Sequence, residues 1–243
     1  MSLLQVPGAR LYYETRGSGP ALLMIPGASG NARIFTAVAE SLAEHHTVVT
    51  YDRRGFSRSS LDGPQDYDHR LATDADDVHR LIEHLGAAPA AVFGTSSGAV
   101  VALTVLARHR SAVCALAAYE PAAVWLLPDG QSWLDFIGRL YDLYRNRGVV
   151  PALAEFREQV LTAGDRQLLA QSVDPGSGEH LHANATHWFE RELLQYSAII
   201  ETPGGHAAAG THPAEFGRTL QHALSTCGAD DPRPGSDGIP VRR

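Results

Sequence analysis

Gly-Thr-Ser-Ser-Gly at positions 94–98 is a G-x-S-x-G pentapeptide between a strand-like run, 90–93, and a helix-forming run, 100–108. A serine on a sharp strand-to-helix turn projects its hydroxyl above the edge of a sheet, and the flanking glycines tolerate strained backbone and close packing. Glycine and serine also fill ordinary turns, so the pentapeptide alone is a weak signal. Its position between a strand and a helix indicates a nucleophile elbow, with Ser96 as the nucleophile.

Strands and helices alternate along the first half of the chain. Continuous apolar runs at 21–25 and 47–51 are typical of strands buried on both faces of a parallel sheet, and 113–119 is a further strand after the elbow helix. The run 11–15 alternates in the way of an edge strand. Residues 68–85 carry an apolar stripe at helical spacing. The pattern predicts an α/β fold with a doubly wound, mostly parallel sheet.

A helical insertion is predicted to interrupt this alternation. Residues 121–197 show helical periodicity without strands, for example at 149–161 and 182–196, and we interpret them as a lid. The core before the lid, including the elbow, occupies 1–120. After it, 198–226 is expected to supply the last core strand, a histidine loop and a final helix, and 227–243 a disordered tail.

The composition excludes several functional classes. A chain of 243 residues can bury one large core, and its 44% hydrophobic and 19% charged residues are ordinary for a globular protein. The net charge of -7 argues against nonspecific binding to nucleic acid or to an anionic membrane. All 20 basic residues are arginines, which excludes a Schiff-base lysine and a P-loop lysine.

The sequence also predicts a compartment. Cys114 lies in an apolar run and Cys227 begins the tail, so we expect no disulfide and a reducing environment. Residues 1–19 lack a basic stretch followed by an apolar one, and no apolar run approaches the length of a membrane span. These features predict a cytoplasmic protein without a membrane partner.

No cofactor is indicated. No G-x-G-x-x-G follows a strand, so a dinucleotide site is not expected. One group of lid residues invites a metal interpretation, but its spacing does not place it on one helical face and no thiolates join it. The group is His180, His182, His187 and Glu190.

A nucleophilic Ser96 needs a base and an oxyanion hole. His206 is the best candidate base because it follows the last predicted strand, and Gly204-Gly205 would let its loop aim the ring. The oxyanion donors would be the backbone N–H groups of Ala28, in a glycine-containing turn, and Ser97, at the start of a helix. An ordinary loop histidine and a simple strand-to-helix turn are the alternative interpretations.

Four stretches together resemble the ordered signatures of the α/β-hydrolase family, from about residue 11 to residue 225. They are Met-Ile-Pro-Gly at 24–27, Tyr-Asp-Arg-Arg-Gly-Phe-Ser-Arg-Ser at 51–59, the pentapeptide at 94–98, and Pro-Gly-Gly-His at 203–206. The resemblance implies that Ser96 is the nucleophile, His206 the base, and Ala28 and Ser97 the oxyanion donors. Asp52 resembles an aspartate that is usually structural in the family.

The segment between the lid and the last strand departs from this pattern. The family usually inserts a strand and a helix there, and its catalytic acid follows that strand. In this sequence 192–196 passes almost directly into 198–200, which leaves no room for a βα unit of roughly two dozen residues. We therefore expect a sheet shortened by about one βα unit. Glu120, which directly follows the strand 113–119, is the candidate acid, although Glu120-Pro121 could simply form a turn.

Four aromatic residues of the lid are candidates for the substrate pocket. They could roof an apolar pocket above Ser96, or they could hold the lid helices together, which we favour for most of them. A mixture of both roles would suit a substrate with an apolar acyl part. These residues are Trp125, Trp133, Phe136 and Trp188.

The sequence therefore predicts a serine-dependent hydrolase of a small apolar ester, thioester or lactone, which acts through an acyl-enzyme without a cofactor. One alternative is a catalytically impaired ligand-binding protein of the same fold. Another is a serine-based lyase, perhydrolase or carbon–carbon hydrolase. A shortened sheet would expose its last strand to pairing with another chain, so a homodimer is left open.

Overall fold

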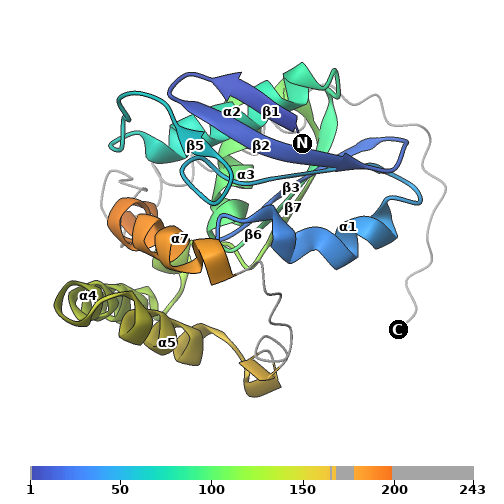
Figure 1. The fold of residues 1–243 in the computed structure, drawn as a ribbon. Helices are drawn as coiled ribbons and strands as arrows, with labels where there is room; N and C mark the ends of the chain where they lie inside the picture. The colour runs from blue at the N-terminus through green and yellow to red at the C-terminus, as the bar shows by residue number, and fades with distance from the viewer. Residues whose placement is uncertain (1, 165, 168–177, 199–243) are drawn as a thin grey trace, which may run out of the picture. The chain divides into compact units, whose positions relative to one another are not determined.

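The computed structural model describes residues 2–164, 166–167 and 178–198, and its centre is a mixed β-sheet (Figure 1). In this part of the chain the sheet has seven strands in the order β1-β2-β4-β3-β6-β7, with β5 paired to β2. Strands β4, β3, β6 and β7 run parallel, and β1, β2 and β5 are antiparallel to their neighbours. The strands are β1 (Ser2–Val6), β2 (Ala9–Arg16), β3 (Ala21–Ile25), β4 (Thr47–Tyr51), β5 (Ser60–Leu61), β6 (Ala90–Thr95) and β7 (Val113–Tyr119).

Helices connect the parallel strands and form the insertion after β7. Three short 3₁₀ turns precede α1, β7 and α4: η1 (Ala32–Phe35), η2 (Arg110–Ala112) and η3 (Val124–Leu126). The α-helices of the described residues are α1 (Thr36–Leu42), α2 (Arg70–His84), α3 (Ser97–Arg108), α4 (Gly130–Arg147), α5 (Val149–Val160), α7 (Gly178–Arg191) and α8 (Leu193–Ala198).

Successive residues of β3 pack against helices on opposite faces of the sheet. Leu23 shares a buried cluster with Val78 of α2 and Val101 of α3. Met24 packs instead with Ala39 of α1. A mostly parallel sheet with helices on both faces is a doubly wound α/β architecture, so the predicted fold class is confirmed.

The first hairpin corrects one prediction. The run 11–15, expected at the edge of the sheet, lies within β2, and β2 is flanked by β1 and β4. A tight turn at Pro7-Gly8, where Gly8 has φ +75°, folds β1 back onto β2. Alternation is typical of any antiparallel strand with one face toward solvent, so the pattern does not distinguish an edge strand from its neighbour.

One face of the sheet is partly open in the described part of the chain. Beside α1 lies an apolar groove of about 590 Å³, which extends across β6 to β7. On β7, Ala115, Ala117 and Tyr119 face this groove and are exposed. Strand β7 is the last strand in the described sheet, and Tyr119 at its end is 58% exposed.

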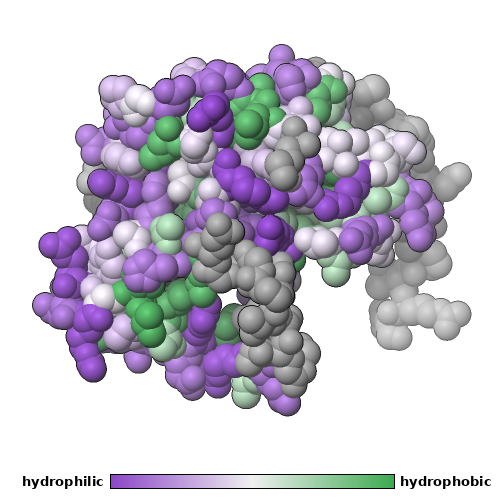
Figure 2. All heavy atoms as spheres, viewed as in Figure 1, coloured by the Kyte–Doolittle hydropathy of each residue, from purple (hydrophilic) through white to green (hydrophobic). Residues whose placement is uncertain are grey.

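The insertion after β7 forms a helical layer with its own buried cluster. Buried members from its helices include Leu140, Ala152 and Phe189. Phe56, from the loop after β4, belongs to the same cluster, so the layer packs directly on the core. Figure 2 shows hydrophobic side chains gathered on the visible surface over these helices. Val150 of α5 is 72% exposed.

Most of the predicted C-terminal part lies outside the described residues. Ala198, predicted to begin the last strand, is the last residue of α8, and 199–243 are not described. The shortening of the sheet by one βα unit therefore stays a prediction. Among the helices described, none has both the length and the apolar character that would let it cross a membrane.

Candidate active site

Ser96 stands at the turn from β6 into α3 with an unusual backbone conformation. Its φ of 54° and ψ of -124° lie in a region that non-glycine residues rarely adopt. A Cβ on Gly94 would lie 2.3 Å from the carbonyl oxygen of Gly98, and one on Gly98 would lie 2.4 Å from the carbonyl oxygen of Ile25. Both glycines are therefore required by close backbone approach, which explains the spacing of the pentapeptide.

The turn after β3 packs against Ser96. A Cβ on Gly27 would lie 3.0 Å from the Cβ of Ser96 and 3.6 Å from its Oγ. Ala28 follows Gly27, and Ser97 is the first residue of α3. Within the described residues, neither the Ala28 N–H nor the Ser97 N–H donates a hydrogen bond. Two unpaired backbone donors therefore lie next in sequence to residues that form the Ser96 site.

A buried network of charges supports the turn at 27–30. Arg53, with a fully buried side chain, donates from Nη2 to the carbonyl oxygen of Gly27 (3.1 Å) and to Oε2 of Glu192 (2.6 Å). Its Nη1 lies 3.3 Å from Oδ2 of Asp74. Arg70 contacts the same two carboxylates, each at 3.1 Å. Two arginines thus share two buried carboxylates, which is the pairing that buried charges require.

The charges of this network are balanced. Burial lowers the pKa of Arg53, but Glu192 and the other acidic partners raise it by more, so the guanidinium stays charged. Burial alone would raise the pKa of Asp74, yet Arg70 and Arg53 hold it below its ordinary value. The hydroxyl of Tyr196 also donates to Asp74. Burial raises the pKa of Glu192 above its ordinary value, and the charges of Arg53 and Arg70 oppose that shift.

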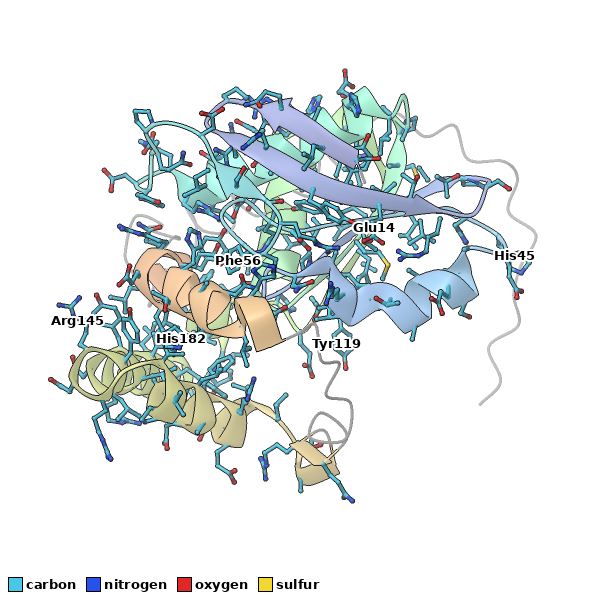
Figure 3. All side chains as sticks on the ribbon, in the orientation of Figure 1. Glu14, His45, Phe56, Tyr119, Arg145 and His182 are labelled. Atoms are coloured by element: carbon cyan, nitrogen blue, oxygen red, sulfur yellow. The ribbon has the colours of Figure 1, made fainter. Side chains whose placement is uncertain are left out.

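Helix α7 of the helical layer holds the loops on the other side of the turn. Nδ2 of Asn184 donates to the carbonyl oxygen of Ser29 (3.0 Å), and its Oδ1 accepts from the N–H of Ser57 (2.8 Å). His187 packs edge-on against Phe56, which is labelled beside α7 in Figure 3, with ring centroids 4.8 Å apart. Burial, together with the charge of Arg70, lowers the pKa of His187 to about 3, so this imidazole is neutral.

Glu120 lies at the carboxyl end of β7, beside the elbow. Its φ is +45°, and its side chain is exposed, without a hydrogen bond or ion pair to the described residues. The backbone around it is tied to Ser96: the Ser96 N–H donates to the carbonyl oxygen of Tyr119 (3.0 Å), and the Ala122 N–H donates to that of Ser96 (3.3 Å). The structure thus brings the end of β7 to the turn that carries Ser96.

Comparison with known proteins agrees with this geometry. The family described as the alpha/beta hydrolase fold matches residues 20–173, more than half of the chain. The uncharacterized hydrolase YraK of Bacillus subtilis (strain 168) is 48% identical over 240 residues, covering 92% of this chain and 84% of that protein. The chain belongs to the alpha/beta hydrolase family.

Two further similar proteins match different shares of this chain. The zearalenone hydrolase of Bionectria ochroleuca is 33% identical over 113 residues, which are 44% of this chain and 43% of that enzyme. The crystal structure of the enol-lactonase from Burkholderia xenovorans LB400 has a TM-score of 0.64 at 16% identity, covering 92% of this chain and all of that one (100%). At that identity, the likeness supports the fold only.

In the hydrolase, Asp52 holds loops together. Its buried carboxylate accepts hydrogen bonds from the N–H of Ala32 (2.9 Å) and from the N–H and Nε of Arg58 (3.1 and 2.6 Å). All of these partners are structural groups of neighbouring turns. This is the structural role that the resemblance implies for Asp52.

Three of the four aromatic candidates pack within the helical layer. Phe136 and Trp188 are buried in the lid cluster, and the half-buried Trp133 packs edge-on against Phe136 with ring centroids 6.0 Å apart. Trp125 is buried in η3. The half-buried Ala28 contacts the same cluster, so the helical layer reaches the turn beside Ser96. Contact with substrate stays a prediction for all four residues.

Other residues of this hydrolase fall outside the sequence prediction or outside the described chain. His206, the predicted base, lies beyond the described residues. Arg53, Glu192 and Asn184 were not singled out as site residues. Arg53 stands within the 51–59 signature, which is a signal of its importance, but no pattern in the sequence indicates that Glu192, 139 residues away, is its partner.

Proposed function

We propose that the protein is a serine hydrolase that cleaves a small apolar ester, thioester or lactone through an acyl-enzyme. The observation that carries the proposal is the strained turn at Ser96, with φ 54° and ψ -124°, packed against the turn that contains Ala28. Strained backbone at a strand-to-helix turn exposes a serine hydroxyl at the top of a sheet, as an activated nucleophile requires. The unpaired N–H groups of Ala28 and Ser97 support the same proposal.

In the proposed reaction, Ser96 Oγ attacks the carbonyl carbon of the substrate while His206 takes the hydroxyl proton. The carbonyl oxygen becomes an oxyanion and accepts hydrogen bonds from the N–H groups of Ala28 and Ser97. The tetrahedral intermediate collapses, and the leaving group departs with the proton from His206. Water, deprotonated by the same imidazole, then attacks the acyl-enzyme and releases the acid.

Glu120 is our candidate for the acid that orients His206. It follows the strand next to the elbow strand, and active sites of open α/β sheets gather at this carboxyl edge. Its carboxylate is exposed and is not engaged by another described residue, so it is free to accept a hydrogen bond from an imidazole.

An apolar acyl group fits the surroundings that the lid provides. Ala28 lies against the lid cluster, whose side chains are almost all aliphatic or aromatic. Burial of apolar surface is worth about 25 cal/mol per Å² and discriminates weakly between similar chain lengths. We therefore propose a substrate class defined by apolar character, acted on in the cytoplasm and without a cofactor.

The test is the intact mass of the full chain after reaction with a fluorophosphonate. The wild type should gain one adduct, whereas Ser96→Ala and His206→Ala should gain none. Ser132→Ala, which removes an exposed serine at the start of α4, should label like the wild type. Absence of the adduct in folded wild type would contradict the proposal and favour a ligand-binding protein of this fold.

A further test addresses Glu120 by itself. Glu120→Gln should lower the turnover of an aryl ester by about 10⁴-fold, the usual effect of losing a triad carboxylate, while substrate binding is retained. Glu155→Gln, a second glutamate with an exposed side chain on α5, should leave turnover unchanged. An equal turnover of the two variants would exclude Glu120 as the acid.

A further inference from the structure

Arg53 holds the peptide group that contains a proposed oxyanion donor. The carbonyl of Gly27 and the N–H of Ala28 belong to one trans peptide, which is planar, so the two groups point in opposite directions. Arg53 donates to the Gly27 carbonyl oxygen at 3.1 Å, and the N–H of Gly30 donates to it at 2.9 Å. These donors fix the carbonyl, and they thereby fix the direction of the Ala28 N–H.

We infer that Arg53 is a positioning residue for the proposed reaction, and that Glu192 of the lid keeps it in place. The inference rests on the proposed function, because Ala28 is an oxyanion donor only in that reaction. Arg53 binds the turn at 27–30 at two points, since its backbone N–H also donates to the carbonyl oxygen of Gly30 at 2.8 Å.

The cationic donor also affects the strength of the amide. A hydrogen bond to a peptide carbonyl polarises the whole peptide group, and a charged donor in a buried site does so more than a neutral one. Both Arg53 and Glu192 have fully buried side chains. Water therefore does not screen the guanidinium, and the Ala28 N–H becomes a better donor to a negative oxygen.

The lid contributes to this arrangement from two positions. Glu192, between α7 and α8, binds the Nη2 atom that holds the Gly27 carbonyl. Asn184, two turns earlier on α7, binds the carbonyl oxygen of Ser29. Ser29 is thus tied to the lid directly and Gly27 through Arg53, so the geometry of the oxyanion hole depends on a docked lid.

The test compares Arg53 with Arg54, its neighbour in sequence. Arg54 is also buried and pairs with Asp77 through two hydrogen bonds of 2.7 and 2.8 Å, but its side chain does not contact the turn at 27–30. The variants are Arg53→Met, Arg53→Lys and Arg54→Lys in the full chain. Circular dichroism and urea titration give the folded fraction of each.

Steady-state hydrolysis of an aryl ester is the first readout. Arg53→Met should lower kcat by about 10²-fold, the usual cost of losing one oxyanion donor, with KM changed by less than about 3-fold. Arg53→Lys, which keeps the charge, should recover about 10-fold of that loss. Arg54→Lys should match the wild type per folded molecule. Equal kcat values for folded Arg53→Met and Arg54→Lys would overturn the inference.

The backbone ¹H–¹⁵N resonance of Ala28 is the second readout, and it does not depend on turnover. Loss of the cationic donor should shift this resonance in Arg53→Met and leave it in place in Arg54→Lys. If the wild type neither labels nor turns over, the proposed function fails, and the resonance alone decides the positioning role. Equal shifts in both variants would overturn that role.

Discussion

Two turns meet at Ser96, and they are stabilised in different ways. The turn from β6 to α3 is shaped by the backbone itself, because Gly94 and Gly98 allow approaches that no side chain permits. The turn after β3 is shaped by side chains from elsewhere, chiefly Arg53 and Asn184 of α7. Five consecutive residues specify the first turn, whereas the second depends on contacts with the helical layer.

The largest effect is expected from removing a charged residue that supports the turn after β3. Glu192→Ala would remove one of the two carboxylates that the buried Arg53 and Arg70 share, and removing one partner of a buried ion pair costs about 3–5 kcal/mol. The free energy of unfolding from urea titration should fall by that amount. Glu190→Ala, which removes an exposed carboxylate of α7 bound to Tyr144, should cost about 0.5 kcal/mol. Similar losses for the two variants would show that the network does not stabilise the fold.

The next largest effect is expected from a substitution in the turn from β6 to α3. Gly98→Ala would place a Cβ 2.4 Å from the carbonyl oxygen of Ile25 and 2.6 Å from that of Pro26, so the backbones must move apart. Overpacking of this kind costs about 1–3 kcal/mol, measured by urea titration. Gly138→Ala is the matched control, because its Cβ would meet nothing within 4 Å and alanine favours a helix by about 1 kcal/mol. Equal stability of the two variants would contradict the close approach.

A smaller effect is expected from removing the hydrogen bonds that α7 makes to the two loops. Asn184→Ala would remove the donor to Ser29 and leave the Ser57 N–H without its side-chain acceptor. The loss of buried hydrogen bonds of this kind costs about 1–2 kcal/mol. Amide hydrogen exchange should rise at residues 27–30 and 55–58 more than in the strands. Unchanged exchange at both loops would show that α7 does not hold them.

The smallest effect is a pH dependence. The pKa of His187 in the folded protein is about 3, below its ordinary value of 6.5, so between these values the unfolded chain binds a proton that the folded chain does not. Stability should therefore fall as pH decreases from 6.5, by about 1 kcal/mol at pH 5 for this partly exposed ring. His187→Gln keeps an acceptor for Arg70 and should remove that dependence. Identical pH profiles would contradict a neutral, half-buried His187.

The sequence predicts the local features of this protein well. Strands at 21–25 and 113–119 have the bounds that their apolar runs indicate, because burial on a parallel sheet leaves a continuous signal. The helix predicted at 182–196 is divided in the structure, with Glu192 between α7 and α8. Helical periodicity continues across this break, so the pattern alone could not reveal it.

The support of the site could not be predicted in the same way. Arg53 and Glu192 are 139 residues apart, and Asn184 and Ser29 are 155 apart. Charged residues in sequence are normally read as solvent-exposed, and only the fold brings these into one buried network. The strained turn at Ser96 could be predicted, since Gly94 and Gly98 each lie only two residues from Ser96 in the sequence.

The most direct test of the account is the rate of fluorophosphonate labelling of Ser96 in folded wild type and in Glu192→Gln. The substitution keeps the size of the side chain and removes the charge that holds Arg53 against the Gly27 carbonyl. We expect labelling of both proteins at Ser96, with the variant slower by about 10-fold because its oxyanion donor is less well aimed. Equal rates in two fully folded proteins would contradict it.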